Sequence, residues 1–269
     1  VRQQLGRLLH GVDAIVGTPG SANLTTTTFA VPALAPYEDD YFNDWYGRFY
    51  DGILKDTEFT VIDFDKEDDD QKKATLTVSP TLASAVTAAD LFEIYPDYSP
   101  AEMNDAINLA IQMVELEALT PIVDEGLIVA ADTWEYDVPS GVAYIDRIYQ
   151  ESSSAGRFSA GTNLVDYRHW RLLAGRKLWF DNSYVSLTAG RILRLVGQKS
   201  PKQLLQDADE TSIGVAYLVY QAKALLHEAR LRGRGSDFEE HESQMRIAQA
   251  RADLERHHVR VSGRGRRVE

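Results

Sequence analysis

Residues 208–232 are apolar around most of the circumference of the helix that they are expected to form. The apolar members of this segment are Ile213, Val215, Ala216, Tyr217, Leu218, Val219, Tyr220, Ala222, Ala224, Leu225 and Leu226. A helix that covers one core face needs an apolar stripe of only about 100°. We therefore expect a second helix or a neighbouring subunit to cover the rest. The candidate subunit-interface residues are Tyr217, Leu218, Tyr220, Leu225 and Leu226.

The next helical segment, residues 237–258, has the opposite character. Ser236-Asp237-Phe238-Glu239 is a capping box, in which two backbone N–H groups at the helix start find side-chain partners. The segment has few apolar positions, and so polar a helix is marginal when isolated. We expect an arm that is poorly ordered in the free protein and docks on a partner. Its candidate partner-binding residues are Phe238, Met245, Arg256, Arg260, Arg264, Arg266 and Arg267.

Charge and composition exclude several classes of protein. The 269 residues are 44% hydrophobic, which suits one or two globular domains with a real core. A formal net charge of −13 argues against general binding of duplex DNA, which needs many Lys and Arg contacts with phosphates. The chain has no cysteine, hence no disulfide, thiolate zinc site or cysteine nucleophile. No apolar run approaches the roughly 20 residues that span a bilayer, and the first residues lack a signal-peptide core, so we expect a soluble protein without a membrane partner.

The pattern up to residue 95 is mainly that of β-structure. Residues 2–10 predict a short amphipathic helix, and residues 24–31, 58–64 and 74–78 are β-branched or alternating. Together they predict a small antiparallel barrel or sandwich. The many aromatic residues of 37–50 are interleaved with acidic ones. We interpret them as cover for this core and as an anchor for a subunit contact, rather than as a carbohydrate or peptide platform.

Helical signals begin after Tyr95. Ser99-Pro100-Ala101-Glu102 is a capping box with proline at the first helical position. The apolar residues that follow at helical spacing are Met103, Ile107, Ala110, Ile111 and Val114. This helix is predicted to end at Thr120-Pro121, because a residue before proline disfavours the helical conformation.

Short strands bounded by turn residues follow this helix. They are residues 127–130, 134–138, 143–149, 170–173, 177–180 and 191–196, which we interpret as hairpins laid against helices. The predicted fold class is α+β in three segments. Residues 1–95 form a short helix and a small antiparallel β domain, residues 96–235 a helical-bundle connector core with hairpins, and residues 236–269 a long helical arm with a basic tail.

The sequence offers no strong catalytic or metal-binding motif. The acidic run Asp63–Asp70 has Asp68 where a calcium loop needs glycine and Ala74 where it needs glutamate, which favours a solvated hairpin turn. His257 and His258 point to different sides of a helix and do not converge with His241 and Glu242. We expect no catalytic residue, cofactor or metal. A carboxylate pair for glycoside hydrolysis stays open, since 41 acidic residues allow many pairs and none stands out.

Several stretches carry a resemblance to a known family. Residues 37–45, 55–65, 76–80 and 90–94 resemble the N-terminal β region of tailed-bacteriophage virion proteins encoded near the portal and capsid genes. Residues 98–110, with their acidic capping box and Asn/Asp-x-x-Ile-Asn pattern, are similar to phage head-tail connector, or adaptor, proteins. The helix around 217–226 and the one over 237–254 add to this likeness.

The resemblance implies a non-enzymatic ring, usually twelvefold, seated beneath the portal with helices around a DNA channel. Its implied partners are the portal protein, neck or tail proteins, and the capsid protein as a further candidate, with DNA passing through non-specifically. The implied location is the neck of the virion, after assembly in the host cytoplasm. Two alternatives remain: a neck or tail-completion protein of the stopper kind, and a virion-associated carbohydrate-active enzyme.

Overall fold

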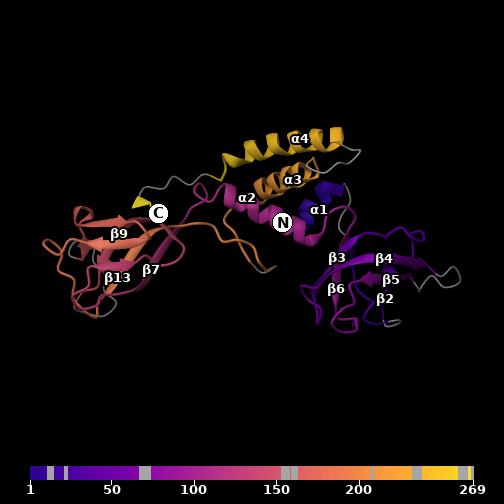
Figure 1. The fold of residues 1–269 in the computed structure, drawn as a ribbon, viewed down its shortest axis with the longest axis horizontal. Helices are drawn as coiled ribbons and strands as arrows, with labels where there is room; N and C mark the ends of the chain where they lie inside the picture. The colour runs from indigo at the N-terminus through magenta and orange to yellow at the C-terminus, as the bar shows by residue number, and fades with distance from the viewer. Residues whose placement is uncertain are drawn as a thin grey trace. The chain divides into compact units, whose positions relative to one another are not determined.

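The structure is a computed structural model in which the chain forms two compact units (Figure 1). The described residues are 1–10, 15–20, 24–66, 74–152, 158, 163–206, 209–231, 238–259 and 266–267. Unit 1 combines three stretches, Val1–Ala110, Leu204–Asp209 and Val215–Glu255. Unit 2 combines Ile111–Gln203, Glu210–Gly214 and Arg256–Glu269. The chain therefore leaves unit 1 and returns to it twice.

A six-stranded antiparallel sheet forms the β part of unit 1. Its strands are β1 (Ile15–Gly17), β2 (Thr28–Ala30), β3 (Tyr46–Asp51), β4 (Glu58–Lys66), β5 (Ala74–Ser79) and β6 (Leu91–Tyr95), in the order β1-β6-β3-β4-β5-β2. Phe29 on the edge strand β2 lies 5.4 Å, ring to ring, from Phe92 on β6, although three strands separate them in the sheet order. The sheet therefore curls, and Phe49 and Phe59 fill the same core.

The aromatic segment at 37–50 contributes to this core. Phe42 and Phe49 are fully buried, while Tyr37 and Trp45 pack against the core with partial exposure. A short 3-10 helix (Pro32–Leu34) precedes the segment. The contact with another subunit that we predicted for these aromatic residues stays a prediction.

Four α-helices occur among the described residues: α1 (Arg2–His10), α2 (Pro100–Met113), α3 (Val215–Leu231) and α4 (Phe238–Arg256). The predicted capping box of α2 is confirmed, because Ser99 Oγ accepts the Glu102 N–H at 3.1 Å and Glu102 Oε2 accepts the Ser99 N–H at 2.9 Å. The predicted end at Thr120-Pro121 is wrong. The helix stops at Met113, and Thr120 begins a strand, whose edge position tolerates the proline.

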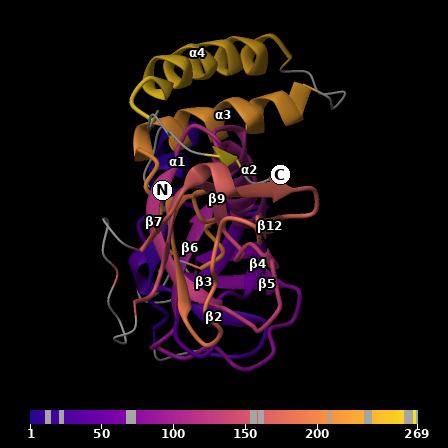
Figure 2. The same cartoon turned by 90° about the vertical axis from the view of Figure 1, so that its left-hand side faces the viewer.

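Helix α1 packs on α3 and on the sheet. Lys223 Nζ of α3 donates to the Leu8 carbonyl oxygen at 2.9 Å, and Leu5 is fully buried. Gly6 faces the ring of Tyr95, where a Cβ atom would overlap the ring. The first helix of the chain is thus held by residues that follow it by more than 200 positions. Figure 2 shows α3 and α4 running side by side as a hairpin.

Unit 2 is built from two antiparallel sheets. The first has the order β10-β9-β13-β7 and contains β7 (Thr120–Ile128), β9 (Val142–Gln150), β10 (Leu164–Val165) and β13 (Ile192–Lys199), with β14 (Arg266–Arg267) also paired to β9. The second has the order β11-β12-β8 and contains β8 (Glu135–Asp137), β11 (Trp170–Leu173) and β12 (Lys177–Phe180), with a 3-10 helix (Tyr167–His169) before β11.

Both sheets of unit 2 contribute to one core. Ile145 and Leu193 come from the first sheet, and Trp170, Leu178 and Phe180 come from the second, all at most 2% exposed. Because the apolar faces of the two sheets pack against each other, the strands form a sandwich that needs no covering helix.

The predicted helical-bundle connector core over residues 96–235 is therefore wrong. Seven strands, β7 to β13, occupy the middle of this region, and only α2 and α3 are α-helical among its described residues. The sequence pattern predicts these short strands as hairpins laid against helices. Each instead buries its apolar face against the other sheet, which makes β-structure dominant in the molecule.

Candidate functional site

Helix α3 is the buried member of the α3–α4 hairpin. Tyr217, Leu218 and Leu226 are 2%, 0% and 5% exposed, so the chain itself covers these three candidate interface residues. Tyr220 and Leu225 are half-buried. Only these two retain surface that a second subunit could reach without a rearrangement of the chain.

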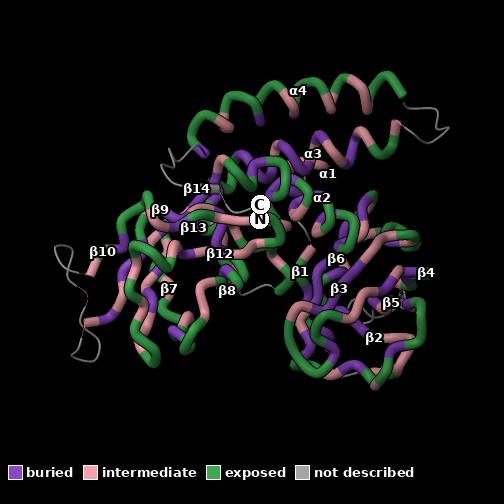
Figure 3. The backbone as a smooth tube through the Cα atoms, turned by 60° about the vertical axis from the view of Figure 1, so that its left-hand side comes forward, coloured by how far each residue is buried: buried purple, intermediate pink, exposed green. Residues whose placement is uncertain are grey.

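Helix α4 has a much thinner contact with the rest of unit 1. Among its residues only Ala248 and Ala252 are buried, and Figure 3 shows most of its length as exposed. Two alanines let the helix backbones approach closely but bury little apolar area. The apolar contribution to α4 docking is consequently small.

Polar pairs set the register between the two helices. Gln221 and Gln249 exchange amide hydrogen bonds, with each Nε2 donating to the other's Oε1 at 3.2 and 3.3 Å. Arg251 Nη1 donates to the Tyr220 hydroxyl at 3.4 Å. Burial, with the charge of Arg251 as a second cause, lowers the pKa of Lys223 on α3. Each neutral hydrogen bond adds only about 1 kcal/mol net, so these pairs orient α4 more than they anchor it.

A histidine pair lies where the C-terminal part of α3 meets the N-terminal part of α4. His227 of α3 is 6% exposed, and its Nδ1 lies 3.0 Å from Nδ1 of His241 on α4. The Tyr98 hydroxyl lies 3.5 Å from the same His227 nitrogen. Since two facing ring nitrogens form a hydrogen bond only when one carries a proton and the other does not, the pair requires at least one Nδ1 without a proton.

The outward side of α4 carries a row of residues that we call the outer stripe: Ser243, Ile247, Ala250 and Leu254. Their spacing of four, three and four residues places them on one helix face. All are exposed, with Ile247 at 50% and Leu254 at 69%. This alternation of small and large side chains at heptad spacing is typical of a helix that packs against another helix.

The predicted partner-binding residues do not gather into one site among the described residues. Phe238 is 51% exposed at the start of α4, and Met245 is half-buried. Arg256 forms a two-pronged ion pair with Glu117, with N–O distances of 3.1 and 2.6 Å. A carboxylate of the same chain therefore already holds this arginine.

The basic tail lies partly outside the described residues, which leave out Arg260 and Arg264. Arg266 and Arg267 form β14, whose backbone pairs with Ile145 and Tyr144 of β9. The residues of the capping box before Phe238, Ser236 and Asp237, also lie outside the described residues.

A groove between α2 and α3, the α2–α3 groove, was not anticipated from the sequence. It has a volume of about 320 Å³, and its apolar lining is Tyr98, Ala106, Leu109, Leu225 and Leu226. Leu109 is 45% exposed on the α2 side of the groove. The available signal was its position just outside the apolar repeat of α2.

The rim of the α2–α3 groove is mainly acidic. Glu102 and Asp105 are exposed on α2. Arg230 of α3 lies over the ring of Tyr98 at 4.9 Å and 4.0 Å from Glu102. The groove therefore offers apolar walls with two carboxylates on its α2 side.

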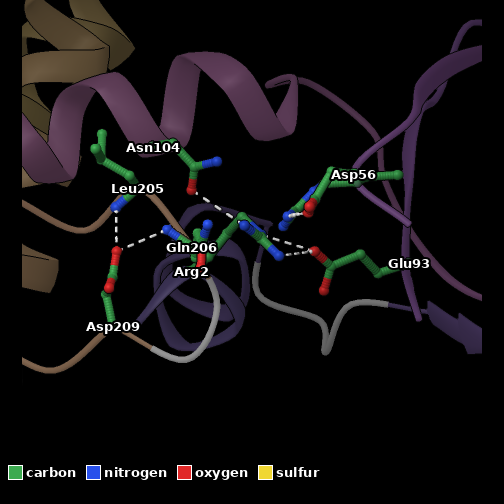
Figure 4. A network of polar contacts seen from close by, with 8 residues as sticks. Arg2, Asp56, Glu93, Asn104, Leu205, Gln206 and Asp209 are labelled. Atoms are coloured by element: carbon green, nitrogen blue, oxygen red, sulfur yellow. Dashed lines mark hydrogen bonds and ion pairs between the residues drawn. The ribbon is translucent and has the colours of Figure 1, made fainter.

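A buried ionic network joins separated parts of unit 1 (Figure 4). Arg2 Nε donates to Glu93 Oε1 at 2.7 Å, and Arg2 Nη1 donates to Asn104 Oδ1 at 3.1 Å. Glu93 is only 1% exposed, and nearby Arg48 pairs with Asp56. Because each arginine is matched by a carboxylate, we interpret the adjoining cavity of 330 Å³ as part of a structural clamp rather than an anion site.

The returning loop is fixed to the same region. Asn108 Oδ1 accepts the Leu204 N–H at 2.8 Å, and Asn108 Nδ2 donates to the Leu204 carbonyl at 3.0 Å. Asp209 Oδ2 accepts the N–H groups of Leu205 and Gln206 at 2.8 and 2.9 Å. These contacts hold the first return of the chain against α2.

Neither metal nor membrane features emerge from the part of the chain that the structure describes. Within it, no three or more His, Asp or Glu side chains converge as metal ligands. No helix within it has the length and apolar character needed to cross a bilayer.

Comparisons of the chain with protein-family models, with curated proteins and with solved structures gave no match.

Proposed function

We propose that this chain is a structural, non-enzymatic virion protein, a head-to-tail adaptor that forms a ring beneath the portal. In this role it links the phage capsid to the tail and continues the DNA channel. The observation that carries the proposal is the α3–α4 hairpin, whose outer helix is weakly held on one face and carries the exposed Ile247 and Leu254 on the other. The resemblance of residues 98–110 and 217–226 to adaptor proteins supplies the specific setting.

The two faces of α4 favour an assembly component. Single exposed apolar residues are ordinary on any protein surface. The outer stripe instead holds two large apolar residues, Ile247 and Leu254, one heptad apart, and in a monomer both would stay in water. A helix with one face on its own chain and exposed apolar residues on the other is suited to join subunits.

Overall charge supports passage of DNA without adhesion. The formal net charge is −13, so a channel wall of average composition would repel phosphates rather than bind them. The cations of residues 256–269 are the local exception, and their sign suits an acidic groove on a portal partner. Portal, neck or tail proteins are accordingly the proposed partners.

Electron microscopy of the purified protein, alone and mixed with its portal protein, tests the proposal. We expect rings that stack on the portal, and deletion of residues 236–269 should leave a folded protein that no longer joins it. A matched variant that lacks only residues 260–269 separates the helical arm from the basic tail. Full portal binding by both truncations would refute the portal role of this arm. Attachment to the tail side instead would favour the stopper alternative.

A further inference from the structure

We propose that the outer stripe of α4 in one copy docks into the α2–α3 groove of a second copy. The inference rests on the proposed function only in requiring that the protein forms homo-oligomers. It names the two surfaces that meet, which ring formation alone leaves open.

The outer stripe and the α2–α3 groove have complementary shapes. A helix that enters a groove presents large apolar anchors separated by roughly one and two turns. Ile247 and Leu254 are two turns apart, with the small Ala250 between them to permit close approach. In the groove, Leu109 and Leu225 keep exposed apolar surface over a floor that includes the buried Leu226.

Charge complementarity identifies the occupant. Arg246 and Arg251 are exposed on either side of the outer stripe, and the groove rim carries Glu102 and Asp105. Arg246 is 74% exposed and pairs with Glu242 of its own helix at 2.6 Å. Opposite charges at the rim of a contact favour one orientation over its reverse and speed association. A ridge that carries Ile247 and Leu254 between two arginines thus suits an apolar groove whose rim holds two carboxylates and Arg230.

The stripe of α4 cannot enter the groove of its own copy in this structure. Ala248 and Ala252 hold α4 on α3, and the outer stripe lies on the opposite side of the helix. A contact between two different surfaces of identical chains is heterologous, so it repeats from copy to copy and closes into a ring when the rotation permits. This is the symmetry that an adaptor ring requires.

Because the chain lacks cysteine, crosslinking can test the contact directly. One preparation carries Ile247→Cys and another, distinguishable by an added mass tag, carries Leu109→Cys. The two are mixed with a short bismaleimide and resolved by mass. We expect crosslinked pairs that contain one copy of each, while Ile53→Cys, at an exposed site of unit 1 outside both surfaces, serves as the matched control.

Each outcome decides between the contact and the ring. Pairs formed mainly by two Ile247→Cys copies would show a symmetric α4–α4 contact and overturn the proposal. Rings seen by electron microscopy without the mixed crosslink would overturn this contact but leave the adaptor function standing. A wild-type protein that stays monomeric at high concentration in sedimentation would overturn both.

Charge-introducing variants give a second, independent measurement. Ile247→Glu with Leu254→Glu, and separately Leu109→Glu, should each shift the sedimentation profile of the full-length chain from ring to monomer. Ile53→Glu should not. Circular dichroism establishes that each variant is folded, and unchanged rings in the folded stripe and groove variants would contradict the proposal.

Discussion

Helices α3 and α4 lie side by side, yet they are held in the molecule by different forces. Eight residues of α3 are buried, including Tyr217 and Leu218, whereas only Ala248 and Ala252 of α4 are. Helix α3 is therefore part of the core of unit 1, and α4 is attached to it through small side chains and polar pairs. The difference separates what the chain needs in order to fold from what it offers to a partner.

The comparison also corrects how the apolar circumference of α3 was interpreted. A wide apolar arc shows that several neighbours are needed, but it does not say whether they belong to the same chain. Here α1 and α4 of the same chain contact α3 through Lys223 and Gln221. The subunit-interface role that we predicted for five α3 residues stays a prediction, for which Tyr220 and Leu225 keep the accessible surface.

The largest difference between the two helices should appear when a charge is placed on each. Leu218→Asp puts a carboxylate at a fully buried position of α3, and we expect a loss of more than about 4 kcal/mol in unfolding free energy. Ile247→Asp on α4 should change it by less than about 0.5 kcal/mol. Urea unfolding followed by circular dichroism measures both. Similar losses would mean that α4 is as much a part of the core as α3.

Overpacking the thin contact should release α4 and spare α3. Ala252→Leu adds bulk at a position that is 0% exposed, and we expect α4 docking to weaken by about 1–3 kcal/mol. Ala250→Leu, on the exposed side of the same helix, is the matched control. Hydrogen exchange should rise in α4 only for the first variant. Equal protection of α4 in both variants would show that the α3–α4 interface can accommodate a leucine at position 252.

Removing the histidine contact should loosen α4 selectively. His241→Ala deletes one of the two ring nitrogens that lie 3.0 Å apart, and we expect a loss of about 1 kcal/mol of docking free energy. Hydrogen exchange in α4 relative to α3 measures this loss.

The matched control is His241→Gln. Its side-chain amide can still donate or accept a hydrogen bond, so the ratio of α4 to α3 exchange should stay close to that of the wild type. An unchanged ratio in the His241→Ala variant would mean that the histidine pair does not contribute to docking.

The smallest effect concerns the glutamine pair. A double-mutant cycle with Gln221→Ala and Gln249→Ala should give a coupling free energy of about 0.5–1 kcal/mol, measured as α4 opening by hydrogen exchange. A coupling near zero would mean that the amides serve only to place α4 in register.

Local signals in the sequence were sufficient for most elements. The capping box at Ser99 marked the start of α2, and the alternating pattern located β8, β9, β11, β12 and β13 to within about three residues. These features depend on neighbours in sequence, where caps, turns and alternation act. The predicted C-terminal end of α2 was wrong because it relied on Pro121 as the stop signal, whereas the chain already turns after Met113.

Contacts between residues far apart in the sequence could not be predicted from such local patterns. Nothing in the strands of residues 120–199 indicates that they pack on each other rather than on helices, because both arrangements demand the same alternation. The α2–α3 groove combines Leu109 with Leu225, which lie far apart in the chain. The pairing of Arg266 and Arg267 with β9 likewise follows from which strand edge is open, and composition does not carry that information.

The discontinuous course of unit 1 has a consequence for how the protein is made. The 119 residues from 96 to 214 separate the end of β6 from the start of α3, since 214 minus 95 is 119. At about 5–20 residues per second, a ribosome needs roughly 6–24 s to produce them. For that interval α1 lacks Lys223, and the sheet and α1 wait with apolar surface uncovered while the strands of unit 2 emerge and pair. The strands of unit 2 would then pair before unit 1 is complete. Chaperone binding to stalled chains should peak before residue 215 leaves the exit tunnel.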